Sequence, residues 1–145
     1  MKRFFITAIV AAAFAVTAQA QTLRFASQGD PQTMDPHSQN ESFTNAVNQQ
    51  QYEYLIHRDK QLNFIPGLAT SWEQLSPLKW RFKLRQGVKF HDGSTFNADD
   101  VVYSMARGRE PTSQIAVYAN AVGMPKKIDD FTVEFEMTKV NPIFP

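Results

Sequence analysis

Strict alternation of apolar and basic residues from position 80 to position 85 restricts the fold of this chain more than any other feature. The apolar positions are Trp80, Phe82 and Leu84, and the basic positions between and after them are Arg81, Lys83 and Arg85. Neighbouring side chains of a β-strand point to opposite faces of a sheet. The spacing therefore predicts a strand with one face in a core and one charged face, which is either solvated or paired with acidic residues of an adjacent strand.

A second strand pattern near the end of the chain supplies acidic residues of this kind. From Phe131 to Met137 every second residue is apolar, and Glu134 and Glu136 occupy the opposite side. Between the two strands, Asp92-Gly93 predicts a turn and Asn97 a helix N-cap. The expected helix has Val101, Val102, Met105 and Ala106 on its apolar face and stops near Gly108, and a short helix is expected within residues 112–122. The fold class predicted is mixed α/β.

Weaker patterns precede these elements. Residues 22–27 alternate as a half-buried strand does, and Asp30-Pro31 and Asp35-Pro36 then break the chain. A helix is expected from Ser42, which we assign as its N-cap. The residues expected to share one face of this helix are Phe43, Ala46, Val47, Gln50 and Tyr54.

The first twenty residues have the composition of a secretory signal peptide. Lys2 and Arg3 precede an apolar run from Phe4 to Val16, and Ala18-Gln19-Ala20 supplies small residues at a cleavage site. A membrane-spanning helix needs about 20 apolar residues, so we expect cleavage after Ala20 and export to the periplasm rather than a membrane-embedded protein. An uncleaved anchor is the alternative.

Removal of this segment changes the charge balance. It takes Lys2 and Arg3 from the 15 basic residues and leaves 13 against 14 acidic ones, a net charge of −1. No basic excess then favours nucleic acid as a partner. The chain has no cysteine, so a disulfide framework is excluded, and so is a lipid-bearing thiol after the signal peptide. The last strand pattern ends eight residues before Pro145, with Ile143 and Phe144 in no recognisable element. We therefore expect either a part of a longer protein or the product of an interrupted reading frame.

Two stretches resemble a known family. One is P-G-L-A-x-x-W at residues 66–72, followed from Trp80 by W-x-F-x-L-R-x-G-V-K-F-H-D-G-x-x-F-N-A-D-D-V; the other is Leu23-Arg-Phe-Ala with Met34-Asp-Pro36. Together they are similar to the N-terminal part of extracellular solute-binding proteins of family 5, the periplasmic dipeptide-, oligopeptide- and nickel-binding proteins of ABC importers. Most of these residues serve a core, a turn or a cap, so the resemblance identifies a fold and no particular solute.

The resemblance implies the N-terminal portion of lobe I of a two-lobed periplasmic binding protein, of the class with an extra subdomain, and incomplete. Residues 21–60 would form the first strand and helix of lobe I. Residues 61–145, with the signature segment 64–105, would begin the extra subdomain. The implied function is periplasmic capture of a peptide or similar small solute for an inner-membrane ABC permease, by a monomer that is not an enzyme and needs no cofactor. Docking of the permease on the basic stripe Arg81, Lys83 and Arg85 is a further option.

Candidate ligand contacts lie in the loop before the first predicted helix, at Asn40, Glu41, Ser42 and Phe43. Family members present cleft contacts at this place, and amide, carboxylate and hydroxyl groups can hold the polar groups of a ligand. The alternative is ordinary helix capping by Ser42. Trp72 and Trp80 could line an aromatic pocket, although core packing is the simpler interpretation.

The enzyme hypothesis is a periplasmic hydrolase that uses His91 with Asp92 and a serine, Ser94 or Ser104. The chain lacks a G-x-S-x-G nucleophile motif. His37, His57 and His91 are twenty or more residues apart, so their spacing predicts no metal site. A third hypothesis is a truncated product without function, since a binding protein that lacks its second lobe has no cleft.

Overall fold

The computed structural model describes residue 22, residues 24–142 and residue 144. The predicted signal peptide and its cleavage site therefore lie outside the described residues. The helices are α2 (Ser42–Asn48), α3 (Ala98–Gly108) and α4 (Ala116–Val122). The strands are β1 (Ile56–Arg58), β2 (Phe64–Pro66), β3 (Ala69–Ser76), β4 (Lys79–Leu84), β5 (Pro125–Asp129) and β6 (Thr132–Glu136). This mixed α/β composition agrees with the fold class predicted from the sequence.

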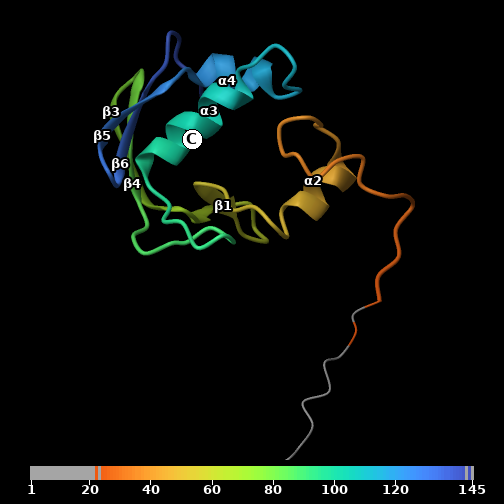
Figure 1. Cartoon of the computed structure of the whole chain (residues 1–145). Coiled ribbons are helices and arrows are strands. Elements are labelled where there is room, and N and C mark those ends of the chain that lie inside the picture. The colour runs from red at the N-terminus through yellow and green to blue at the C-terminus, as the bar shows by residue number, and fades with distance from the viewer. Residues whose placement is uncertain (1–21, 23, 143, 145) are drawn as a thin grey trace, which may run out of the picture.

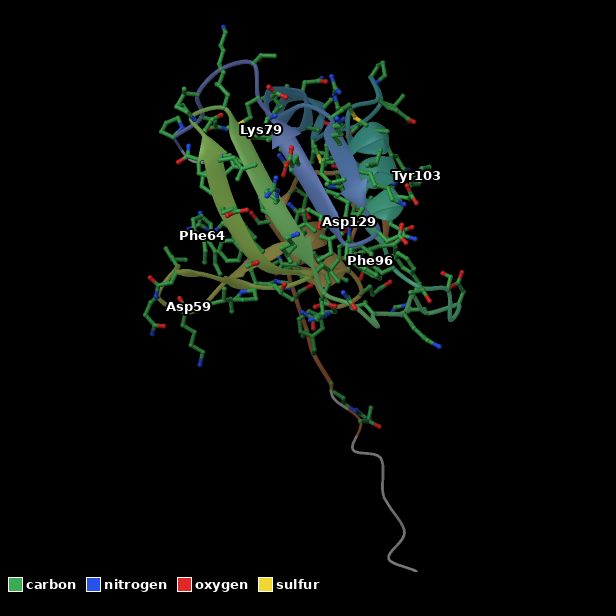
Figure 2. The ribbon with its side chains drawn as sticks, turned by 90° about the vertical axis from the view of Figure 1, so that its left-hand side faces the viewer. Asp59, Phe64, Lys79, Phe96, Tyr103 and Asp129 are labelled. Carbon is green, nitrogen blue, oxygen red and sulfur yellow. The ribbon has the colours of Figure 1, made fainter. Side chains whose placement is uncertain are left out.

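The main sheet is antiparallel, with the strand order β3-β4-β6-β5. The two strands predicted from alternation, β4 and β6, are its central pair. Phe82 lies opposite Val133 and Arg81 lies opposite Glu134 in that pair, so apolar and charged residues separate onto the two faces. Figure 1 shows α3 lying across one face of the sheet, with α4 next to α3. Figure 2 shows the sheet from the side that α3 does not cover.

The core fills the space between the sheet and α3. Phe82, Leu84, Val133 and Phe135 are buried on the sheet, and Val101 is buried on α3. The Phe82 and Phe135 rings meet edge to face, with centroids 5.4 Å apart. Trp72 and Trp80 are partly buried against the same cluster, which agrees with the core-packing interpretation of both residues.

The start of α3 follows the predicted capping chemistry. The Asn97 side chain accepts a hydrogen bond from the Asp99 backbone N–H at 2.7 Å, and the Asp100 carboxylate accepts one from the Asn97 backbone N–H at 2.8 Å. These reciprocal bonds form a capping box and satisfy backbone donors that the first helical turn leaves free. The helix ends at Gly108, as predicted.

Just before β3 begins, the backbone at Gly67 lies close to the backbone at Tyr54. The hairpin of β1 and β2 precedes Gly67, and the Leu68 backbone N–H donates to the Tyr54 carbonyl oxygen at 2.8 Å. A Cβ atom on Gly67 would lie 2.3 Å from that oxygen. Only glycine therefore fits this position without movement of the backbone.

The N-terminal part of the chain corrects two predictions. The prediction of a strand over residues 22–27 is wrong, because the described residues of this range, Thr22 and residues 24–27, lie in no strand. Alternation alone does not make a strand without a partner to accept its backbone hydrogen bonds. The helix expected from Ser42 is present but ends at Asn48, and its buried residues are Thr44 and Asn48 rather than the residues expected to share one face.

An apolar hollow of about 330 Å³ remains open beside the core. Its lining comes from β1, the sheet, α3, α4 and three residues outside these elements, Leu55, Ile115 and Phe144. The lining residues within elements are Ile56, Phe82, Met105, Tyr118, Ala119, Val122 and Phe135. Strands β3 and β5 form the two outer edges of the described four-stranded sheet. The described strands thus do not close into a barrel or a sandwich. A closed barrel or sandwich would have contradicted the family resemblance.

Candidate functional site

The loop predicted to contact ligand immediately precedes α2. We call residues 40–43 the ligand loop. The Glu41 carboxylate accepts hydrogen bonds from the backbone N–H groups of Thr44 and Phe43, the second at 3.2 Å. Glu41 is therefore the N-cap of α2, and the prediction that Ser42 has this role is wrong. The longer glutamate side chain reaches back over the first turn, and the bonds from Thr44 and then Phe43 hold the pKa of Glu41 below its usual value.

The other ligand-loop residues make fewer or weaker intramolecular contacts. The Asn40 side-chain oxygen accepts a long hydrogen bond of 3.4 Å from the Asn45 amide, and Ser42 is exposed. The Phe43 ring stacks on Phe25 with 6.5 Å between centroids. The structure thus places an amide, a hydroxyl and an aromatic ring at one turn. The carboxylate of Glu41, in contrast, is hydrogen-bonded as the N-cap of α2.

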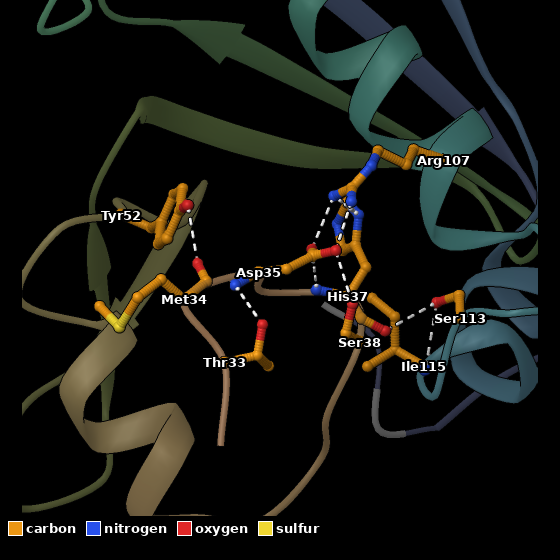
Figure 3. Close-up of polar contacts among 9 residues, drawn as sticks. All are labelled: Thr33, Met34, Asp35, His37, Ser38, Tyr52, Arg107, Ser113 and Ile115. Atoms are coloured by element: carbon orange, nitrogen blue, oxygen red, sulfur yellow. Dashed lines mark hydrogen bonds and ion pairs between the residues drawn. The ribbon is translucent and has the colours of Figure 1, made fainter. Parts of the chain in front are cut away.

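A polar cluster lies just before this loop and was not predicted from the sequence. Figure 3 shows the Arg107 guanidinium reaching from α3 to the Asp35 carboxylate. Arg107 donates to both carboxylate oxygens of Asp35, at 2.8 Å for the bond from Nη1 to Oδ1. This two-pronged geometry is the strongest arrangement of an arginine–carboxylate pair. With further bonds from the Ser38 hydroxyl and the His37 backbone N–H, it holds the pKa of Asp35 far below its usual value.

His37 joins the same cluster through its ring and its backbone. Its Nδ1 lies 3.0 Å from Nη1 of Arg107. Its carbonyl oxygen accepts from the Gln114 backbone N–H at 2.9 Å and from the Ser113 hydroxyl at 3.4 Å. Burial, and then the positive charge of Arg107, lower the pKa of His37. A neutral imidazole is therefore favoured at this position near neutral pH.

Two further contacts tie the same segment to α2 and the residues after it. The Tyr52 hydroxyl donates to the Met34 carbonyl oxygen at 2.9 Å. The Gln32 backbone N–H donates to the Thr44 hydroxyl at 3.1 Å. Residues 32–38, which we call the strap, therefore lie between α2 on one side and α3 with the turn before α4 on the other.

The basic stripe of β4 is largely engaged by acidic partners. Arg81 pairs with Glu134 at 2.6 Å and with Glu73 at 3.4 Å, as expected for a charged face on paired strands. Lys83 donates to the Thr132 hydroxyl at 3.0 Å. Arg85 turns instead to Glu53, at 2.7 Å. The proposed partner Glu136 binds Lys79 at 3.4 Å.

The residues of the hydrolase hypothesis do not assemble. The Asp92 carboxylate accepts hydrogen bonds from the backbone N–H and the hydroxyl of Ser94, at 2.9 and 2.7 Å, in a tight turn. Within the described part of the chain, no hydrogen bond joins His91 to Asp92, Ser94 or Ser104. A nucleophile needs a base within hydrogen-bond reach, and this arrangement provides none.

Residues 22, 24–142 and 144 contain no group of three or more His, Cys, Asp or Glu side chains placed to hold a metal ion. The same residues contain no helix with the length and apolarity needed to cross a bilayer.

The sequence could not reveal the Asp35–His37–Arg107 cluster. Asp35 and Arg107 are 72 positions apart, and the charged residues of the chain offer many other pairings. A weak indication was available, because Asp35 lies in the Met34-Asp-Pro36 turn that carries part of the family resemblance.

Comparison with known proteins links this architecture to a family. Residues 63–145 match the family described as bacterial extracellular solute-binding proteins, family 5 Middle. A relative from Escherichia coli K12, a dipeptide-binding protein, is 34% identical over 153 residues, which cover 90% of this chain and 29% of the relative.

Solved structures agree with the sequence match. The murein tripeptide-binding protein MppA of Escherichia coli superimposes with a TM-score of 0.70 and 26% identity, over 77% of this chain and 26% of MppA. NikZ from Campylobacter jejuni, solved with Ni(L-His), gives a TM-score of 0.71 and 26% identity, over 79% of this chain and 23% of NikZ. The chain thus spans about a quarter of the length of the relatives it matches.

Proposed function

Because this chain belongs to the family 5 bacterial extracellular solute-binding proteins, we propose that it forms part of a periplasmic protein that captures peptides or similar small solutes for an ABC importer. The observation that carries the proposal is the agreement of sequence and fold over 77% of the chain with MppA. The hydrolase hypothesis does not compete with it, since His91 lacks a serine or aspartate partner among the described residues. We propose a binding role without chemistry of its own, as the names of the relatives suggest.

We propose the domain arrangement that the family resemblance implies. Residues 1–20 are a signal peptide cleaved after Ala20, residues 21–60 open lobe I, and residues 61–145 begin its extra subdomain. The solute binds between two lobes, and hinge closure buries it for presentation to the inner-membrane permease. The protein acts as a monomer in the periplasm. The apolar hollow and the outer edges of β3 and β5 support a role within a larger lobe.

Within this arrangement, the ligand loop supplies lobe I contacts to the solute. The Asn40 amide can both donate and accept hydrogen bonds, and the exposed Ser42 hydroxyl can do the same. Phe43 offers an aromatic surface, and Glu41 shapes the turn through its bonds to the first turn of α2. These groups suit the amides and side chains of a short peptide better than an isolated ion.

The solute class is peptides and peptide-like molecules of low mass. The relatives include a dipeptide-binding protein, a murein tripeptide-binding protein and a protein solved in complex with Ni(L-His). All three ligands present amide or amino-acid groups. Hydrogen-bonding side chains at a cleft recognise these groups regardless of the side chains of the ligand.

Titration tests the proposal directly. The full-length protein is titrated with pools of dipeptides, tripeptides and amino acid–nickel complexes by calorimetry, and Asn40→Ala with Ser42→Ala is the matched double variant. We expect saturable binding by at least one pool and weaker binding by the variant. Absence of binding to every pool would contradict the solute-capture function, and equal affinity of the variant would contradict the role of the ligand loop.

A second candidate is that the 145 residues alone bind no solute. The exposed apolar hollow of about 330 Å³ favours it, because an uncovered surface of this kind promotes association rather than selective capture. Titration of the 145-residue chain beside a full-length protein separates the two possibilities. Equal affinity of both proteins would contradict the second candidate.

A further inference from the structure

Two ion pairs flank α2 and connect its surroundings to the rest of the molecule. Before the helix, Asp35 on the strap binds Arg107 of α3. After the helix, Glu53 binds Arg85 at 2.7 Å. Figure 1 shows α2 standing apart from the main sheet. The ligand loop lies on the strap side of α2, so contacts of the strap decide how firmly it is held.

We propose that Arg107 is a positioning residue for the ligand loop, because its guanidinium holds the strap and thereby orients residues 40–43 relative to α3. The inference rests on the proposed function of that loop and adds a residue that does not touch the solute. Arg107 donates to both Asp35 oxygens and contacts His37 Nδ1 at 3.0 Å. One side chain thus engages two strap residues.

The strap transmits this constraint to the loop through its own hydrogen bonds. The Asp35 carboxylate also accepts from the Ser38 hydroxyl at 2.6 Å and from the His37 backbone N–H at 3.0 Å. These bonds fix the turn over residues 35–38, and the ligand loop begins two residues later. On the other side, Gln32 binds Thr44 in the first turn of α2. The loop is therefore held from both of its ends.

Acidification should weaken the same contact. A proton on His37 places a second positive charge against Arg107. The charged groups that face the imidazole are Asp35 on the strap, Arg107 on α3 and Glu110 just after α3. Asp35 is already committed to Arg107, so the added charge is only partly compensated. Loosening of the strap at lower pH would therefore report on the contact between His37 and Arg107. If Arg107 acted only through other contacts, protonation of His37 would not loosen the strap.

Hydrogen–deuterium exchange of the intact chain tests the proposal. In Arg107→Met, the amides of residues 32–48 should exchange about tenfold faster, as expected for loss of a partly solvated, charge-assisted pair, while β4 and β6 keep their protection. Arg107→Lys should show a smaller increase, because an ammonium cannot form the fork. Arg109→Met is the matched control, since Arg109 binds Asn120 at 2.8 Å and does not touch the strap.

Three results of the exchange experiment would overturn the inference. These are unchanged exchange of residues 32–48 in Arg107→Met, the same acceleration in Arg109→Met, or acceleration spread equally over β4 and β6. Solute titration separates this inference from the proposed function. A wild-type protein that binds nothing refutes solute capture, while exchange still reports on the strap. A variant that loosens the loop yet binds the solute as tightly as the wild type refutes the positioning role of Arg107 and leaves solute capture standing.

Discussion

Replacement of Gly67 by alanine should destabilise the protein more than the same methyl addition at any other described glycine. The new Cβ would lie 2.3 Å from the Tyr54 carbonyl oxygen and 2.7 Å from Cδ2 of His57. The imidazole can rotate away, but the carbonyl belongs to the backbone and accepts a hydrogen bond from Leu68 at 2.8 Å. Relief of the clash to 3.0 Å requires a shift of at least ~0.7 Å where β1 approaches the entry to β3.

The magnitude follows from two contributions. Overpacking of a close contact costs about 1–3 kcal/mol, and weakening of the Leu68–Tyr54 hydrogen bond adds about 1 kcal/mol. We therefore expect a loss of about 2–4 kcal/mol, which corresponds to a fall of roughly 6–15 °C in Tm for a domain of this size. Relative to a typical total stability of about 5–15 kcal/mol, this is a large effect.

Thermal and urea unfolding followed by circular dichroism measure the change. Gly29→Ala is the control, since no heavy atom beyond Gly29 and its two chain neighbours lies within 4 Å of the point that its Cβ would occupy. The stability of this variant should change by less than about 0.5 kcal/mol. Adding His57→Ala to Gly67→Ala should restore little of the lost stability, because the backbone carbonyl oxygen of Tyr54 remains in place. Equal midpoints for Gly67→Ala and Gly29→Ala, or full rescue by His57→Ala, would refute the backbone-clash argument.

Three further predictions concern the cap, the strap and the histidine that resembled a catalytic residue. Asn97→Ala removes the reciprocal cap of α3 and should cost about 1 kcal/mol in urea unfolding; an unchanged midpoint would show that the cap contributes nothing. Burial and the charge of Arg107 lower the pKa of His37 in the folded protein. As the pH falls, His37 is therefore protonated first in the unfolded chain, and stability should fall below about pH 6.5. Unfolding between pH 7.5 and 5 should show a shallower fall in His37→Gln, and identical slopes would contradict the assignment. His91→Ala should leave solute affinity unchanged, and a loss of peptide hydrolysis in this variant would revive the enzyme hypothesis.

Local patterns predicted the central sheet and α3 well. Alternation located β4 and β6, and the spacing of Asn97 and Gly108 bounded the helix between them. These elements follow from a side-chain period and from capping chemistry, both of which operate within a few residues. The basic stripe was expected to be either solvated or paired with Glu134 and Glu136, and the ion pair of Arg81 with Glu134 agrees with the second alternative.

The N-terminal region was predicted less well for a different reason. Residues 24–27 alternate but form no strand, and α2 buries Thr44 and Asn48 instead of the apolar residues around them. Thr44 is buried where the Gln32 backbone binds its hydroxyl. The packing of this region depends on which distant segment lies against it, and periodicity holds no information about that neighbour.

Residue order alone thus indicated the family through the motifs of residues 64–105. It also located the strands that alternate and the helix with a cap, because these elements depend on interactions between near neighbours. Folding in three dimensions decided that Arg107 meets Asp35 and His37, that Glu41 rather than Ser42 caps α2, and that glycine is required at position 67. Each of these outcomes depends on distances between groups that the chain must first bring together. Many pairings of charge and hydrogen-bonding groups are compatible with the same sequence, and only the packed backbone selects among them.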